Sequence, residues 1–165
     1  MEDTMKVVAT YKEAFWGKEG LSGAALPRGG GPLVQIWDNC VENDKGEVKT
    51  AALGAFILGK DCARAAGMSA EAVEKEVLDQ LASLFGDKAR SMLVSLRQMN
   101  WINEEWTNAG GRVPQGGFGD QALREPHGRV IFAGTETEDF HGHMEGAIAS
   151  GVRACKQAEA ILASS

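Results

Sequence analysis

Glycine constrains this chain more than any other residue type, because 21 of the 165 residues are glycine and most of them gather in three places. These glycine clusters lie at Arg28–Pro32, at Gly110–Gly119 and around Gly134–Gly151. Glycine is used where the backbone must turn with a positive φ or approach another group closely. The clusters are therefore interpreted either as ordinary hairpin turns or as the lining of a cofactor site.

Stretches with the composition of β-strands occur in the first hundred residues. They are short, rich in apolar and β-branched residues, and separated by polar or glycine-containing segments. These stretches are Lys6–Tyr11, Leu33–Trp37, Ala51–Leu58 and Ser91–Trp101. Gly54, inside the third stretch, would let another group approach the backbone closely. We therefore predict that the first three stretches form an antiparallel sheet with short connections.

Helices are expected after the third predicted strand. A brief helix is predicted at Lys60–Ala66, and a longer one begins after Ser69, a suitable N-cap, and ends at Gly86. The apolar residues of the longer helix recur with helical spacing, so they share one face. They are Val73, Val77, Leu78, Leu81, Leu84 and Phe85. We interpret this stripe as part of the core.

The last third of the chain predicts a strand, a glycine loop and a helix in succession. Arg129–Ala133 has the composition of a buried strand, Gly134–Glu136 forms the loop, and Met144–Ala163 is rich in helix-forming residues. Gly146 and Gly151, on a face shared with alanines, would let this helix lie close to a neighbour. The unpaired amides of a helix start can hold an anion or a polarisable ring, although many such turns bind nothing.

Charge and cysteine usage exclude several classes of protein. Acidic residues outnumber basic ones by 23 to 17, which gives a net charge of −6 and no basic footprint for nucleic acid. Cys40, Cys62 and Cys155 are odd in number and widely scattered, so they predict neither a disulfide framework nor a metal site. We interpret them as small buried hydrophobic residues in a reducing compartment.

Metal and membrane sites are not predicted either. His141 and His143 lie two residues apart, but no third ligand is evident beside them. No apolar run approaches the ~18–20 residues of a membrane span, and the first residues lack the plan of a signal peptide. We therefore expect a soluble, cytoplasmic protein without a membrane partner.

Two segments resemble flavin-containing monoamine oxidases. Gly128–Ala147 reads G-R-V-I-F-A-G-T-E-T-E-D-F-H-G-H-M-E-G-A and closely resembles the C-terminal FAD-binding segment of that family. Lys6–Trp16, which reads K-V-V-A-T-Y-K-E-A-F-W, is similar to the family's strand that carries a lysine near flavin N5. Asn100 and Trp101 also fit the pattern. The resemblance runs in family order from Lys6 to about Leu162.

The resemblance implies a mixed α/β (α+β) fold. Residues 1–100 would be a substrate-domain-like sheet with helices, and residues 101–165 would supply the strand and helix that complete an FAD site. Lys6 would be catalytic, by holding a water beside flavin N5. The FAD-binding residues would be Trp101, Gly134, Thr135, Glu136, His143 and Met144, and the substrate-binding residues would be Val113 and His143. The reaction would be oxidative deamination of an amine by dioxygen.

The sequence departs from the family pattern near Gly110. Animal monoamine oxidases place a flavin-linking cysteine after the paired glycines, whereas Arg112 follows Gly110-Gly111 here. Any FAD would therefore be bound non-covalently. Val113 and His143 stand where those enzymes have two tyrosines that enclose the amine, so a changed substrate range is expected.

The 165 residues contain no G-x-G-x-x-G turn, which a dinucleotide site needs for the pyrophosphate. We expect the chain to be a C-terminal portion that lacks the N-terminal FAD-binding half, retains FAD poorly and is inactive alone. Self-association or docking of the missing half would cover its exposed apolar surface. Two alternatives stay open: a non-catalytic remnant that acts as a binding module, and a fragment of a polyamine or amino-acid oxidase.

Overall fold

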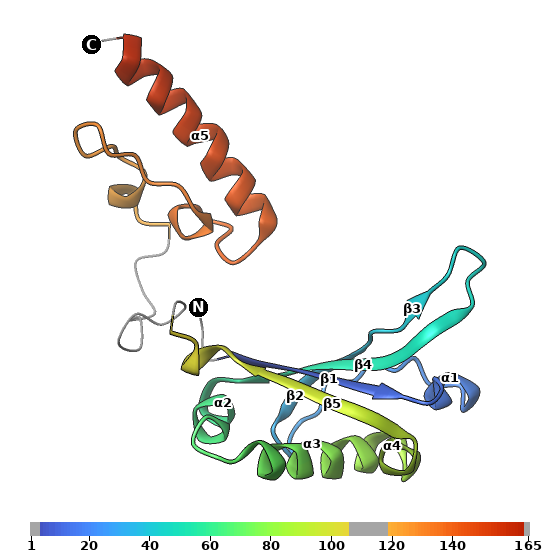
Figure 1. The fold of residues 1–165 in the computed structure, drawn as a ribbon. Coiled ribbons are helices and arrows are strands. Elements are labelled where there is room, and N and C mark those ends of the chain that lie inside the picture. The colour runs from blue at the N-terminus through green and yellow to red at the C-terminus, as the bar shows by residue number, and fades with distance from the viewer. Residues whose placement is uncertain (1–3, 106–118, 164–165) are drawn as a thin grey trace. The chain divides into compact units, whose positions relative to one another are not determined.

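The computed structural model describes residues 4–105 and 119–163. The chain divides into two compact units, Met1–Val113 and Pro114–Ser165. Figure 1 shows the elements of each unit.

The N-terminal unit is built on an antiparallel sheet in the order β2-β4-β1-β5. Its strands are β1 (Thr4–Tyr11), β2 (Leu33–Asp38), β4 (Val48–Leu58) and β5 (Leu93–Asn100), and the short β3 (Val41–Glu42) pairs with β4. The first three predicted strands lie inside β1, β2 and β4, so the predicted antiparallel sheet is confirmed. The fourth predicted strand, Ser91–Trp101, corresponds to β5, which begins two residues later, at Leu93.

The late start of β5 has a local cause. A short helix, α4 (Lys88–Ser91), occupies the first residue of the predicted strand. β5 ends where a 3₁₀ turn, η1 (Trp101–Asn103), begins, and Asn100 caps this turn by accepting the Ile102 amide at 3.1 Å.

Helices cover one face of the sheet (Figure 1). They are α2 (Gly59–Ala65), α3 (Ala70–Phe85) and α4, while the short α1 (Phe15–Lys18) follows β1. The inward residues of the strands and the apolar stripe of α3 form one core. The buried members of that stripe are Val73, Val77, Leu81 and Phe85. Each such side chain stabilises the fold by roughly 1.5–3 kcal/mol.

The predicted ends of α3 are confirmed. Ser69 Oγ accepts the Ala72 amide at 3.2 Å, which satisfies one of the unpaired donors of the helix start. Gly86 ends the helix with φ +82°, a conformation that residues with a Cβ rarely adopt. The stripe itself is only partly core, because Leu78 is half-buried and Leu84 is exposed.

Gly31 and Gly54 lie where a side chain would not fit. A Cβ on Gly31 would lie 2.4 Å from Gln80 Oε1, and a Cβ on Gly54 would lie 2.5 Å from the Trp37 ring. The predicted close approach at Gly54 is therefore confirmed. The first glycine cluster serves packing against α3 at Gly31.

An aromatic cluster follows the end of β1. The rings of Tyr11, Phe15 and Trp16 meet edge to face, with centroids 5.1–5.5 Å apart. Trp16 Nε1 donates to Asp38 Oδ2 at 2.7 Å. Burial raises the pKa of Tyr11, whose hydroxyl is enclosed by the core.

The C-terminal unit contains one long helix, α5 (Met144–Ala163), as predicted. Two 3₁₀ turns, η2 (Gln121–Leu123) and η3 (Thr135–Thr137), precede it along the chain.

The predicted buried strand at Arg129–Ala133 is wrong. Within it only Val130 forms a bridge, to His127, across the turn at Gly128. Val130 and Phe132 are 54% and 41% exposed. Within residues 119–163 no neighbouring strand offers a hydrogen-bond ladder to this segment, so its apolar composition does not produce a strand.

The three cysteines differ in burial. Cys62 is buried as predicted, Cys40 is half-buried, and Cys155 is exposed, so the interpretation as a buried residue is wrong for Cys155. Across residues 4–105 and 119–163, no three metal-ligating side chains gather into a group that could hold an ion. None of the helices in the described ranges combines the length and apolarity that crossing a membrane requires.

Candidate functional site

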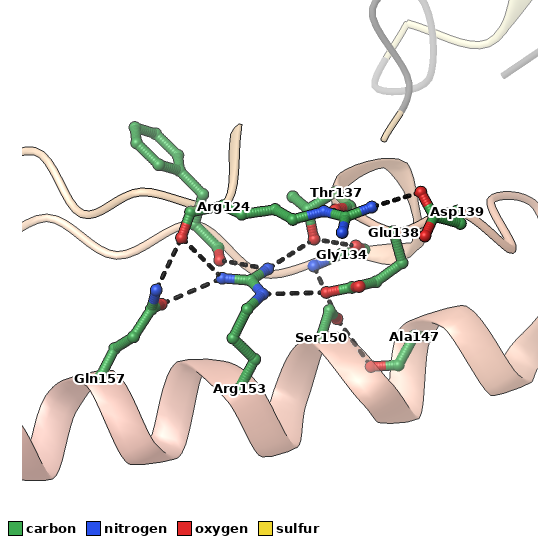
Figure 2. A network of polar contacts seen from close by, with 10 residues as sticks. Arg124, Gly134, Thr137, Glu138, Asp139, Ala147, Ser150, Arg153 and Gln157 are labelled. Carbon is green, nitrogen blue, oxygen red and sulfur yellow. Dashed lines mark hydrogen bonds and ion pairs between the residues drawn. The ribbon is translucent and has the colours of Figure 1, made fainter. Parts of the chain in front are cut away.

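The turn at Gly134–Thr137 is attached to α5 at two places near the helix start. Gly134 N donates to Ser150 Oγ at 3.0 Å, and Ser150 Oγ in turn donates to Ala147 O at 2.7 Å (Figure 2). Thr135 Oγ1 lies 3.2 Å from His143 O, the carbonyl that directly precedes the helix. Ser150 is buried, so the first attachment is shielded from water. The turn and the helix start therefore form one packed element.

Two glycines of the third cluster are required by this packing. Gly134 has φ +147°, and a Cβ there would lie 2.8 Å from Glu136 Oε2. A Cβ on Gly146 would lie 2.3 Å from Phe140 O. The predicted close approach is therefore confirmed at Gly146. At Gly151 a Cβ would meet no atom within 4 Å, so the described residues make no close approach there.

The start of α5 presents amides that have no intrahelical partner. The Ala147 amide donates to His143 O at 3.3 Å, which opens the helical ladder. The amides of Met144, Glu145 and Gly146 precede that bond, and helix geometry gives them no intrahelical carbonyl. The dipole of this 20-residue helix adds roughly half a positive charge at the same end. An anion or an electron-rich ring edge would be stabilised here.

The side chains at the helix start leave it accessible within this unit. Met144 is 85% exposed, and His143 and Glu145 are also exposed. His143 Nδ1 lies 3.0 Å from His141 O. Because a carbonyl can only accept, this contact is a hydrogen bond when Nδ1 carries the proton, which leaves Nε2 as an acceptor.

Polar side chains along one side of α5 complete the attachment of the turn. Ser150, Arg153 and Gln157 all reach from the helix toward the segment that contains the turn (Figure 2). Sequence reasoning missed all three. Their spacing of three and four residues in an alanine-rich helix is the signal that could have found them.

In the N-terminal unit, Lys6 lies on the sheet face opposite the helices. Met5, Val7 and Ala9 are buried in the core, so the alternation of β1 turns Lys6 to the other face, where it is exposed. Lys6 Nζ lies 5.3 Å from the centroid of the Phe56 ring, a cation–π distance.

Phe56 also contacts Trp37, which brings three residues together on that face. The Trp37 and Phe56 centroids are 4.8 Å apart with the rings tilted by 49°. We call Lys6, Trp37 and Phe56 the open-face cluster. Sequence reasoning missed both aromatic residues, because their proximity depends on the register that pairs Lys6 with Phe56 and Trp37 with Gly54.

The remaining predicted site residues divide between the two units of the chain. Trp101 is half-buried in η1, directly after Asn100, which pairs with Met5 of β1. Val113 lies outside the described residues. The structure thus brings together the predicted residues of the third glycine cluster, which are Gly134, Thr135, Glu136, His143 and Met144. Lys6 and Trp101 belong to the N-terminal unit.

Comparison with known proteins identifies the class to which this fold and site belong. The sequence model of the family described as flavin containing amine oxidoreductase matches residues 1–158. A probable flavin-containing monoamine oxidase A of Dictyostelium discoideum is 36% identical, over 95% of this chain and 34% of that protein. Amine oxidase [flavin-containing] A of Sus scrofa is 29% identical over 93% of this chain and 29% of that protein.

Solved structures agree with the sequence comparison. Cyclohexylamine oxidase from Brevibacterium oxydans superposes with a TM-score of 0.79 and 31% identity, over 96% of this chain and 35% of that one. Wild-type putrescine oxidase bound to putrescine gives a TM-score of 0.75 and 25% identity, over 97% and 35% of the two chains.

The chain belongs to the flavin containing amine oxidoreductase family. The resemblance to monoamine oxidases and the mixed α/β fold class are both confirmed. The chain spans about a third of the length of the relatives it matches.

Proposed function

We propose that this chain forms part of a flavin-dependent amine oxidase and contributes to its FAD site. The observation that carries the proposal is the Gly134–Thr137 turn, which is fixed against the exposed start of α5, where the first amides have no intrahelical partner. The family of the chain supports a flavin as the group that this element holds.

The residues at the turn fit such a group in three respects. The helix start offers amide donors together with the positive end of a dipole. Gly134 has a backbone conformation that residues with a side chain rarely adopt, and Gly146 leaves out a side chain that would collide with the backbone of Phe140. Met144, the first residue of the helix, is strongly exposed. A diphosphate or the electron-rich edge of an isoalloxazine ring suits donors of this kind.

In this proposal each residue has a physical task. Bound FAD would supply the two-electron oxidation of an amine to an imine and the return of those electrons to dioxygen. Gly134, Thr135 and Glu136 would lie against the cofactor. The backbone at His143 and Met144 would direct the positive end of the α5 dipole at the flavin and stabilise negative charge there.

Lys6 is proposed as the catalytic residue that holds a water beside the flavin. Its ammonium group lies over the ring of Phe56, so its position is set by a neutral partner that leaves the charge uncompensated. Trp101 is proposed to border the same cofactor, and Val113 and His143 to border the amine. The open-face cluster supports an amine substrate with an apolar body.

FAD is proposed to bind non-covalently, because Arg112 follows Gly110-Gly111 where a linking cysteine would stand. The 165 residues contain no G-x-G-x-x-G, so the adenosine diphosphate part of FAD would be held by other polypeptide. We propose residues 1–100 as substrate-domain-like and residues 101–165 as the FAD-site segment, in a soluble, cytoplasmic protein that associates with itself or with a nucleotide-binding half. The lack of that glycine turn also favours a second candidate, a non-catalytic module with the same fold.

Two measurements, FAD binding and flavin reduction by amines, separate these functions. FAD is titrated into the chain, alone and with a separately expressed nucleotide-binding half, and binding is followed by flavin absorbance and fluorescence. A panel of aryl, alicyclic and diamine substrates is then added without oxygen. The oxidase proposal predicts that an amine bleaches the bound flavin. FAD binding without bleaching by any amine favours the module, and no binding with either sample contradicts both the oxidase and its FAD site.

A further inference from the structure

Arg153 uses all five N–H donors of its guanidinium. Its Nε donates to Glu138 Oε1 at 2.9 Å. Nη1 donates to Arg124 O at 3.3 Å and to Gln157 Oε1 at 3.0 Å. Nη2 donates to Phe132 O at 3.3 Å and to Thr137 Oγ1 at 2.7 Å (Figure 2). No other common side chain can satisfy five acceptors from one point.

The acceptors lie on both sides of the Gly134–Thr137 turn. Phe132 precedes the turn, and Thr137 and Glu138 close it. Arg153 therefore holds the chain where it enters and where it leaves the turn. The side chains of Arg153 and Glu138 are only 21% and 15% exposed, so their ion pair is partly shielded from water and salt.

Thr137 extends this hold to the backbone of Gly134. Its hydroxyl accepts from Arg153 and donates to Gly134 O at 2.8 Å. The amide of Gly134 is held separately by Ser150. The amide of Gly134 is thus held by Ser150 of α5. Its carbonyl oxygen is held by Thr137, which is in turn held by Arg153 of α5.

A direct role for Arg153 as an anion ligand does not fit these contacts. Its charge is paired with Glu138, and its donors already have acceptors within the chain. A ligand phosphate would have to displace that network.

We infer that Arg153 is a positioning residue, which fixes the Gly134–Thr137 turn at one spacing from α5 before any cofactor is present. The importance of that spacing for FAD rests on the proposed function. The spacing itself is a property of this chain alone.

The inference is tested first without FAD, by NMR-detected amide exchange of the chain and of Arg153→Met, Arg153→Lys and Glu138→Gln. Lys156→Met is the matched control, since it removes an equal charge from an exposed position on the same helix. In Arg153→Met the amides of Gly134 and Thr137 are expected to exchange about tenfold faster or more. In Lys156→Met they are expected to be unchanged.

The lysine variant separates positioning from simple support of the helix. Lysine can pair with Glu138 but cannot reach both flanks of the turn. Arg153→Lys should therefore keep the slow exchange of the α5 amides and still lose slow exchange at the turn. If Arg153→Met unfolds the unit, Arg153→Lys and Glu138→Gln decide the outcome. Unchanged exchange at the turn in those variants, or full rescue by lysine, overturns the inference.

A second arm links the spacing to the cofactor. FAD affinity is measured for the wild-type chain, Arg153→Lys and Lys156→Met, each with the nucleotide-binding half added. Arg153→Lys is expected to bind FAD roughly tenfold more weakly than the other two. If the wild-type chain binds no FAD, the proposed function fails while the exchange data still decide the positioning role. If Arg153→Lys binds FAD as tightly as the other two proteins although its turn exchanges faster, only the link between the spacing and FAD is refuted.

Discussion

Gln80 on α3 binds both backbone groups of Leu33, the first residue of β2. Gln80 Oε1 accepts the Leu33 amide at 2.6 Å, and Gln80 Nε2 donates to Leu33 O at 3.0 Å. Gln80 is 1% exposed, so both bonds lie in the core. One side chain thus gives Leu33 the two contacts that a neighbouring strand would otherwise give.

Loss of the Gln80 side-chain amide should destabilise the N-terminal unit strongly. Gln80→Leu has nearly the same volume but leaves the Leu33 amide and carbonyl buried without partners. We expect a loss of about 2–5 kcal/mol in the free energy of unfolding, measured by urea titration. Gln35→Leu, at an exposed position of β2, is the control and should change stability by less than about 0.5 kcal/mol. Equal effects of the two variants would contradict the role of Gln80.

Gly54 should tolerate no side chain while Trp37 is present. A Cβ would lie 2.5 Å from the indole, so Gly54→Ala is expected to cost about 1–3 kcal/mol of stability. In the double variant Gly54→Ala, Trp37→Ala the cost should be less than the sum of the single effects. Gly17→Ala, where a Cβ meets nothing within 4 Å, is the control. Strictly additive effects in thermal unfolding would show that the two residues are not in contact.

The ionisation of Asp38 should make the stability of the N-terminal unit depend on pH. Partial burial opposes ionisation, but hydrogen bonds from the Cys40 amide and the Trp16 indole outweigh it and lower the pKa of Asp38. A lowered pKa in the folded state adds stability that is complete above the unfolded pKa, near 3.8, and is lost as pH falls through the folded pKa.

Asp38→Asn tests that dependence. At pH 7 the variant should be less stable by about 1 kcal/mol, a value reduced for solvent screening because the residue is exposed. Urea titrations at pH 7 and pH 3 should show the difference becoming smaller in acid. A difference that stays constant or grows would exclude the ionised carboxylate as its cause.

Lys6 should matter for chemistry more than for folding. In FAD-loaded protein, Lys6→Met is expected to slow flavin reduction or reoxidation by roughly tenfold or more, because the ammonium proposed to hold a water beside the flavin would be lost. Stopped-flow absorbance of the flavin measures both rates. Lys12→Met, a loss of the same charge just after β1, should leave both rates unchanged. Wild-type rates in Lys6→Met would remove this lysine from the mechanism.

Local sequence patterns were enough to predict the elements themselves, although β1 pairs with β4 and β5, which lie far along the chain. Strands β1, β2 and β4 and helices α3 and α5 follow local patterns of burial and propensity, and Ser69 and Gly86 mark helix ends through local geometry. The segment at Arg129–Ala133 has equally apolar residues but no strand beside it within residues 119–163. Composition alone could not reveal that, because a strand requires a partner.

The candidate site was predictable from its backbone features and not from its side-chain contacts. Gly134 and the start of α5 could be located from the glycine pattern and the resemblance. The contacts of Trp37 with Phe56 and of Arg153 with Glu138 depend on strand register and on the folding of a turn against a helix. Such pairings are set by tertiary structure, which a single sequence does not display.

The proposed FAD site is tested most directly by an NMR titration of the chain with FAD up to millimolar concentration, at which weak binding in fast exchange is visible. FAD binding at this site should cause concentration-dependent shifts of the amides of Gly134, Thr135, Glu136 and Met144, and none at the far end of α5 around Leu162. Saturating FAD that shifts other amides and leaves that turn and the helix start unchanged would contradict it.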